Sequence, residues 1–108
     1  SIHLQADNFD CRNAETQTEI NQCAYQDFQQ KDEELSQIYQ QYYVKLETKR
    51  QQQLQHAQSV WMTFRDLSCQ YEADYYQGGS LAPMVYSSCL KDKTIERIND
   101  LKNYIALY

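Results

Sequence analysis

The side chains with the most distinctive chemistry in this sequence are its four cysteines, Cys11, Cys23, Cys69 and Cys89. No two of them form a Cys-x-x-Cys pair, and neither histidine lies close to a cysteine in the sequence. The spacing therefore does not match a zinc site, and no metal or other cofactor is predicted. An even number of cysteines in a small chain instead indicates two disulfides formed in an oxidising compartment.

The pairing of these cysteines has two candidate solutions. Local pairing, Cys11 with Cys23 and Cys69 with Cys89, is favoured because it avoids the mismatch in level that the alternative requires, and each bridge would contribute about 3 kcal/mol by closing a loop. The alternative joins Cys23 to Cys69 and Cys11 to Cys89. In an antiparallel pair of helices that turns near residue 49, Cys23 would lie roughly 9 Å from the level of Cys69, which makes that bridge awkward.

Catalytic groupings are sparse. Asp66 and Glu72 could be read as a pair of carboxylates, but six residues along a helix leave them on different faces. No Ser–His–Asp or comparable nucleophile grouping is recognisable, and all four cysteines are better explained as bridged. The sequence therefore predicts a protein that is not an enzyme.

The elements that must position these residues are expected to be helices. The chain has two glycines and one proline, all within 78–83. A β-sandwich or barrel needs turn residues every 8–12 positions, so an all-α fold is predicted.

Thr16 and Glu19 form a capping box, which starts a helix. Apolar residues then recur at helical spacing in one stripe: Ile20, Ala24, Phe28, Leu35, Ile38, Tyr39, Tyr42 and Leu46.

A second helical stripe follows without any residue that breaks a helix. It contains Leu54, Ala57, Trp61, Phe64, Leu67 or Ser68, and Tyr71. One unbroken helix from Thr16 to Tyr76 would be roughly 90 Å long and would need a second chain to pair with. A turn within the polar residues 47–53 is favoured, giving an antiparallel hairpin of two long helices.

One or two shorter C-terminal helices are expected to complete the fold. The second long helix should end before Gly78, Pro83 can open a short helix, and Thr94 can cap a last one. The apolar face of that last helix is Ile95, Ile98, Leu101, Ile105 and Tyr108. Residues 1–108 are expected to form one domain with an irregular segment at 1–13.

Charge limits the classes of partner. The net charge is −5 and the isoelectric point about 4.8, which disfavours nucleic acid and anionic membrane surfaces. No apolar run approaches the 18 residues of a membrane span. A basic protein is the partner that this charge favours. A monomer is favoured, with dimerisation through Tyr-rich helices left open.

Five residues of the central and C-terminal regions are interpreted as structural. They are Trp61, Phe64, Arg65, Asp66 and Arg97. Trp61 is expected in the core, and one of the two arginines is expected to pair with a carboxylate between helices.

The candidate binding site is the segment around the two glycines. Loops on a rigid scaffold commonly carry binding, Tyr is a favoured contact residue, and Gly allows close approach of the backbone. A Gly-Gly-Ser tip between Cys69 and Cys89 could enter a cleft of a partner. The proposed contact residues are Asp74, Tyr75, Tyr76, Gly78, Gly79 and Ser80.

The same residues carry a family pattern. Its blocks are Phe9-Asp10-Cys11 with Ala14, Thr16, Glu19, Ile20 and Cys23-Ala24; Leu35 and Tyr39; Ala57-Gln58-Ser59-Val60-Trp61 with Phe64-Arg65-Asp66 and Cys69; Gly78-Gly79-Ser80; Cys89-Leu90; and Thr94-x-x-Arg97-x-x-x-Leu101. The order of these blocks resembles the LprI-like lysozyme-inhibitor domain, over nearly the whole chain.

The resemblance implies an exported, helical, disulfide-linked bacterial protein. The family takes its name from a lipoprotein that inhibits lysozyme. The hypothesis is therefore a periplasmic or secreted binding protein that inhibits a lysozyme-type glycosidase, with the loop covering a basic cleft. The alternative hypothesis is an interaction module of the cell envelope that inhibits no enzyme and could be dimeric.

Overall fold

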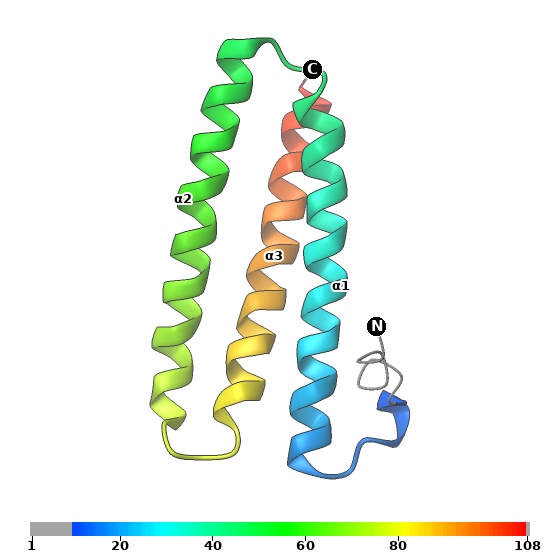
Figure 1. Ribbon diagram of the computed structural model, residues 1–108, viewed down its shortest axis with the longest axis vertical. Coiled ribbons are helices and arrows are strands. Elements are labelled where there is room, and N and C mark those ends of the chain that lie inside the picture. The colour runs from blue at the N-terminus through cyan, green and yellow to red at the C-terminus, as the bar shows by residue number, and fades with distance from the viewer. Residues whose placement is uncertain (1–9, 108) are drawn as a thin grey trace, which may run out of the picture.

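The computed structural model describes residues 10–107, and within that range it contains three long helices, each antiparallel to the one before it in the chain, and no strand (Figure 1). The predicted all-α fold, with its hairpin of two long helices followed by a C-terminal helix, is confirmed. The elements in chain order are η2 (Cys11–Asn13), α1 (Gln17–Tyr43), α2 (Thr48–Ala73), η3 (Asp74–Tyr76) and α3 (Ala82–Ala106).

The start of α1 is fixed by the predicted capping box. The Thr16 hydroxyl accepts a hydrogen bond from the Glu19 amide at 3.1 Å. The Glu19 carboxylate accepts from the amides of Glu15 at 3.0 Å and Thr16 at 3.1 Å. These two backbone hydrogen bonds stabilise the charged form and lower the pKa of Glu19 below its ordinary value of 4.5.

The turn between α1 and α2 lies earlier than predicted. It occupies residues 44–47, whereas the polarity of the sequence placed it within 47–53. Residues 48–53 are helical because glutamine is a good helix former, and polarity alone does not end a helix. The side chain of Gln51 donates to the Tyr43 carbonyl at 2.9 Å, which joins the two helices across the turn.

The expected break before Thr94 is absent, and α3 is one helix almost as long as the other two. Pro83 lies in its first turn, where the missing backbone N–H costs nothing. Thr94 is fully buried in mid-helix and accepts a hydrogen bond from Arg65 Nη1 at 3.3 Å. The Thr94 hydroxyl therefore bonds to Arg65 of α2 and does not cap a helix, as the sequence had suggested.

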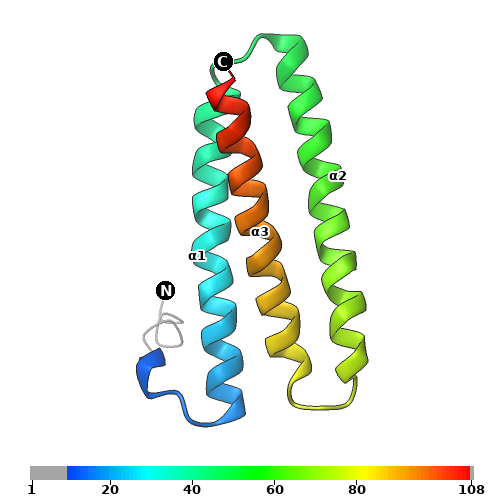
Figure 2. The same cartoon turned by 180° about the vertical axis from the view of Figure 1, so that it is seen from behind.

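The core lies mainly between α1 and α3, which make the most extensive contact, and α2 packs on α3 (Figure 2). The predicted stripe of α1 supplies Phe28, Leu35 and Tyr42 as buried side chains. The two buried clusters are Leu35, Tyr42, Leu46, Leu54, Ile98 and Leu101, and Phe28, Cys69, Cys89 and Leu90.

Both disulfides have the favoured local pairing. Cys11–Cys23 joins η2 to α1, and Cys69–Cys89 joins α2 to α3, with Cα–Cα distances of 5.7 and 5.4 Å. Within the segment 1–13, predicted to be irregular, residues 11–13 form η2. Residues 1–9 and Tyr108 lie outside the described residues.

The face that α2 buries differs from the predicted stripe. Phe64 is 60% exposed, and Leu67 and Tyr71 are also exposed, so Phe64 does not lie in the core, and its ring instead has the Lys93 ammonium 6.0 Å from its centroid. The buried seam of α2 instead contains Leu54, Gln58, Arg65, Cys69 and Ala73. Two long polar side chains thus take positions that hydrophobicity assigned to apolar ones.

Candidate functional site

The predicted binding segment lies at the end of the bundle where α2 returns into α3 (Figure 1). η3 extends α2 by one turn, and the chain then reverses at Gly78, whose φ is 85°. This left-handed backbone favours glycine, as the sequence predicted. Gly78, Gly79, Ser80 and the three residues of η3 are all exposed.

The tyrosines beside the loop form an exposed pair. The hydroxyl groups of Tyr71 and Tyr75 are 2.9 Å apart, and their rings meet edge to face with centroids 5.5 Å apart. Tyr75 is 74% exposed, and its hydrogen bond with Tyr71 raises its pKa. Asp74 accepts from the Gln70 amide at 2.9 Å and keeps its carboxylate at the surface.

The loop is anchored on both sides. The Asn21 side chain on α1 donates to the Ser80 carbonyl at 3.0 Å, and the Gly79 amide donates to the Tyr76 carbonyl at 3.0 Å. The disulfide between Cys69 and Cys89 joins the two helices just behind the loop. A segment held in this way has little conformational entropy left to lose on binding.

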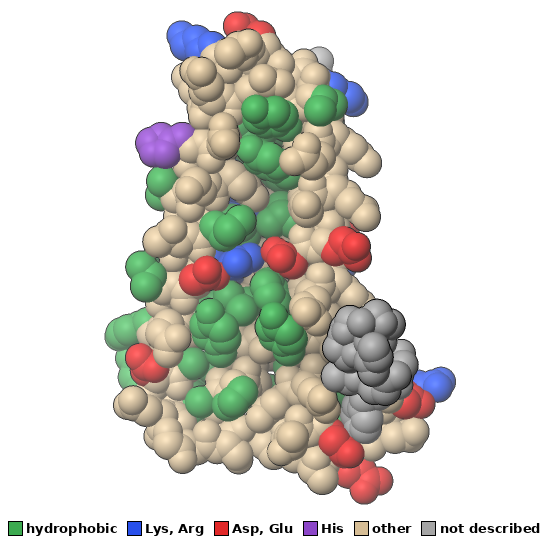
Figure 3. Space-filling view, in the orientation of Figure 1, with side chains coloured by type: hydrophobic (Ala, Val, Ile, Leu, Met, Phe, Trp, Pro, Cys, Tyr) green, Lys and Arg blue, Asp and Glu red, His purple; other side chains and the backbone are tan. Residues whose placement is uncertain are grey.

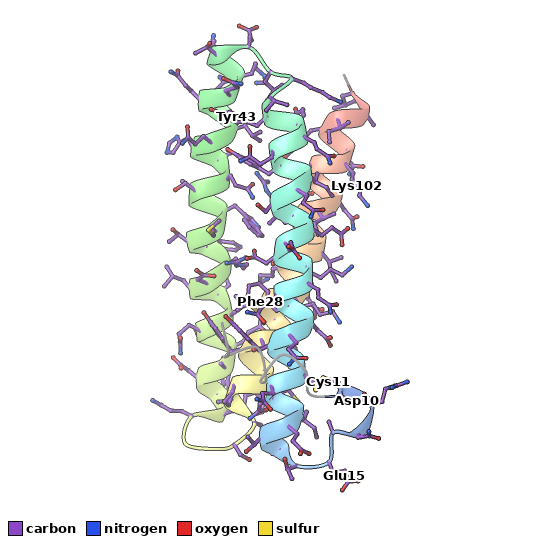
Figure 4. All side chains as sticks on the ribbon, turned by 45° about the vertical axis from the view of Figure 1, so that its right-hand side comes forward. Asp10, Cys11, Glu15, Phe28, Tyr43 and Lys102 are labelled. Carbon is purple, nitrogen blue, oxygen red and sulfur yellow. A yellow bond between two sulfur atoms is a disulfide. The ribbon has the colours of Figure 1, made fainter. Side chains whose placement is uncertain are left out.

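Charge is distributed unevenly along the bundle. The half that carries the loop, residues 10–30 and 61–94, has eight acidic and four basic residues. The other described half, residues 31–60 and 95–107, has six of each. Figure 4 places Asp10 and Glu15 near the loop end, and Lys102 towards the opposite end. The excess negative charge of the described residues therefore lies in the half of the bundle that carries the candidate loop.

Three of the residues interpreted as structural, Trp61, Arg65 and Arg97, meet in a stack of rings and guanidinium groups between the helices. The Arg65 guanidinium lies 5.3 Å from the Phe28 ring centroid and 5.1 Å from that of Trp61. The Arg97 guanidinium lies 5.7 Å from Trp61 and 5.9 Å from Tyr104. This stack includes residues of all three long helices, and it places both buried arginines against aromatic faces.

Arg65 also has polar partners on each neighbouring element. Its Nη1 lies 3.4 Å from the Asp32 carboxylate on α1 and 3.3 Å from the Thr94 hydroxyl on α3. Its Nε lies 2.9 Å from Asp66. The guanidinium is therefore an interhelical anchor, and Asp66 helps to hold it.

Arg97 is held in a similar way. Its Nε donates to the Gln58 side chain at 2.9 Å, and its Nη1 lies 3.7 Å from Asp100. The sequence did not point to Asp32, it pointed to Gln58 only as part of the family pattern, and it suggested a helix cap for Thr94. The signal available for Gln58 was its position on the same helical face as Trp61, Arg65 and Cys69.

Asp66 and Glu72 do not converge into a catalytic pair. Asp66 pairs with Arg65, and Glu72 is exposed on another face of α2. Among residues 10–107, no three His, Cys, Asp or Glu side chains are grouped so that they could hold a metal ion. In the same range, no helix is sufficiently long and apolar to span a bilayer.

A groove lies between α1 and α2 on the face shown in Figure 3, where apolar side chains are visible along its length. One cavity along it, of about 380 Å³, is lined by residues of both helices, including Leu35, Tyr39 and Met62. The cavity is open and lies away from the loop end, and it contains none of the predicted contact residues.

Comparison with known proteins gives two matches. Residues 10–101 match the family model described as "Lysozyme inhibitor LprI". An uncharacterized protein of Rhizobium meliloti (strain 1021) is 31% identical over 106 residues, which cover 86% of this chain and 76% of that protein. No solved structure matches.

Proposed function

Because this chain belongs to the LprI lysozyme-inhibitor family, we propose that it inhibits a lysozyme-type glycosidase with the end of the bundle that carries residues 74–81. The observation that carries this proposal is the exposed loop between η3 and α3, anchored by Cys69–Cys89 and by the hydrogen bond from Asn21 to Ser80. The contact residues are Asp74, Tyr75, Tyr76, Gly78, Gly79 and Ser80.

Inhibition in this proposal is steric. The Gly78–Gly79 tip has no side chains, so its backbone can approach the floor of a narrow cleft. The exposed rings of Tyr75 and Tyr76 supply contact area around it with little side-chain entropy to lose. No catalytic group is required of the inhibitor, in agreement with an inhibitor family and with the dispersed carboxylates.

Electrostatic attraction would also bring the loop end of the bundle towards a basic enzyme. The loop half of the bundle carries the excess of acidic residues, and Glu72 and Asp74 lie next to the loop. A basic enzyme would approach this end first, and its association rate would fall as the salt concentration rises. The partner in this proposal is a basic lysozyme, encountered in the bacterial periplasm or outside the cell, where disulfides persist.

The test is cell-wall lysis by c-type, g-type and i-type lysozymes with the protein added at micromolar excess and low salt. We expect slower lysis with at least one type, and weaker inhibition at high salt. Unchanged lysis with all three at low salt would refute inhibition of these enzymes.

A loop variant locates the binding surface. Gly79→Trp suits this purpose because Gly79 does not have a positive φ, and an added Cβ would lie 3.3 Å from the Tyr76 carbonyl oxygen, which requires only a small local shift of the backbone. Val44→Trp, in the exposed turn at the opposite end, is the matched control. We expect Gly79→Trp to lower inhibition at least tenfold and Val44→Trp to leave it unchanged. Equal inhibition by both variants would show that the binding surface is not the loop.

A second candidate function is an envelope interaction module with no enzyme target. The exposed apolar face of α2, which includes Phe64 and Leu67, favours it. Unchanged lysis in the assay above, together with self-association of the purified protein, would favour this function over inhibition.

A further inference from the structure

The side of α2 that faces away from the bundle is unusually apolar. Five residues spaced four, three, four and four apart share it and are each between 57% and 74% exposed. We call them the outer face of α2: Val60, Phe64, Leu67, Tyr71 and Tyr75, the last one in η3. Apolar side chains are visible along this edge of the molecule in Figure 3.

The outer face is more apolar than parts of the seam that α2 buries. Gln58 and Arg65 point into the bundle, while Phe64 and Leu67 point out. Side chains of this size leave on the order of 600 Å² exposed per copy, at the upper end of the patches found on monomers. A contiguous patch of this size indicates a surface that another molecule covers.

The charges that α2 itself contributes occur towards the ends of this face, and Lys93 of α3 places its Nζ 6.0 Å from the Phe64 ring centroid. From Gln51 to Phe64 the sequence has no Asp, Glu, Lys or Arg. Lys49 and Arg50 precede the face in the sequence. Glu72 and Asp74 lie at its other end, between Tyr71 and Tyr75. The surface is thus basic at one end, apolar along its length and acidic at the other end.

We propose that the outer face of α2 binds the same face of a second copy, with the two α2 helices antiparallel. An antiparallel two-fold pair brings the basic end of each copy to the acidic end of the other, whereas a parallel pair would oppose like charges. The surface is therefore complementary to itself, and self-complementarity identifies a second copy as the occupant.

The register follows from matching these ends. With the two-fold axis near residue 62, Lys49 lies about 20 Å to one side and Asp74 about 18 Å to the other, so they face each other across the dimer. The same axis places Phe64 against the partner's Val60 and Leu67 against the partner's Ala57. The area available per copy approaches the roughly 800 Å² of a standard interface, which predicts a moderate affinity.

Sedimentation equilibrium from micromolar to millimolar concentration tests the proposal. We expect a reversible monomer–dimer equilibrium that Leu67→Glu weakens at least tenfold. Val44→Glu is the matched control because Val44 is as exposed as Leu67 but lies in the turn after α1. A wild-type protein that stays monomeric throughout, or equal weakening by both variants, would overturn the proposal.

Charge reversal tests the antiparallel register. Lys49→Asp and Asp74→Lys are each expected to weaken the dimer several-fold, and the double variant, which restores both opposite-charge pairs, is expected to recover it. If the double variant dimerises more weakly than either single variant, this register is excluded. Circular dichroism confirms that each variant is folded.

The dimer and the proposed inhibition can fail separately. Asp74 and Tyr75 belong to both proposed surfaces, so the dimer would cover part of the lysozyme site. Leu67 is not among the proposed lysozyme contacts, so monomeric Leu67→Glu should inhibit at least as well as the wild type. If inhibition is absent while the dimer forms, only the proposed function is refuted.

Discussion

At the scale of single residues, Arg65 makes the greatest variety of contacts. Its side chain is only 7% exposed, lies between the rings of Phe28 and Trp61, and is bonded to carboxylates and to Thr94. Buried charge is costly unless every donor has a partner, and here the partners come from all three long helices. The residue therefore fixes how the helices are aligned more than it adds to stability.

Replacing Arg65 with alanine should lower the free energy of unfolding by about 2–3 kcal/mol, because packing and cation–π contacts are lost. The loss stays below that of a fully buried ion pair because Asp32 and Asp66 are half exposed and can be rehydrated. Arg65→Met, which keeps the length and the apolar packing, should cost less than about 1.5 kcal/mol. Urea unfolding measures both values.

The matched control for Arg65 is Arg12, which pairs with Asp10 at 3.1 Å on the surface. The pair lowers the pKa of Asp10, but both side chains are in contact with solvent. Arg12→Ala should change stability by less than about 0.5 kcal/mol. A loss for Arg65→Ala no larger than that for Arg12→Ala would contradict the role assigned to the buried stack.

At the scale of elements, the two disulfides have different tasks. Cys69–Cys89 lies in the core beside Phe28 and Leu90 and joins α2 to the helix on which it packs. Cys11–Cys23 attaches the short η2 to the start of α1, and Cys11 is exposed. The first bridge therefore holds the bundle together, and the second holds its N-terminal edge.

Replacing Cys69 and Cys89 by alanine should lower the free energy of unfolding by about 3 kcal/mol or more. The reason is that the core loses a disulfide between cysteines 20 residues apart in the sequence. Replacing Cys11 and Cys23 should cost less, because the loop is shorter and Cys11 is exposed. Thermal unfolding without reductant compares the variants. The reverse order of the two losses would show that the N-terminal bridge is the main constraint.

The elements also show what sequence patterns can predict. The stripe of α1, its capping box, the turn at Gly78 and the local disulfides were all predictable, because each depends on residues close in the chain. The buried face of α2 was not, since Gln58 and Arg65 are stable inside only through partners on other helices. Periodicity detects hydrophobicity and not such partners. Cys69, which the favoured pairing bridges to Cys89, marked the correct face.

The candidate loop was predictable for a simpler reason. Two glycines and a proline are confined to 78–83, and the rest of the sequence is compatible with helices. Tyr75 was among the predicted contact residues, but the exposure of Tyr71 and of the other apolar residues on the outer face of α2 could not be predicted, because a strong helical stripe of apolar residues is normally buried.

At the scale of the whole molecule, α1 and α3 form the closely packed pair, and α2 is attached mainly to α3. The largest buried cluster draws Leu35, Tyr42 and Leu46 from the first helix and its turn, Ile98 and Leu101 from α3, but only Leu54 from α2. Regions with fewer buried apolar contacts open more readily.

Native-state hydrogen exchange should therefore show lower protection in the middle of α2 than in α1 and α3. Protection in α2 should rise towards Cys69, where the disulfide holds it to α3. The measurement should use dilute protein or Leu67→Glu, so that self-association does not add protection. Equal protection of the three helices would contradict the loose attachment of α2.

The position of Trp61 gives the molecule an internal optical probe. It is the sole tryptophan among ten tyrosines, and its ring lies between the guanidinium groups of Arg65 and Arg97. Its fluorescence emission should shift to longer wavelength when the three helices separate and water reaches the indole. Events at the loop or on the outer face of α2 should leave that emission nearly constant. One unlabelled sample therefore distinguishes unfolding from binding.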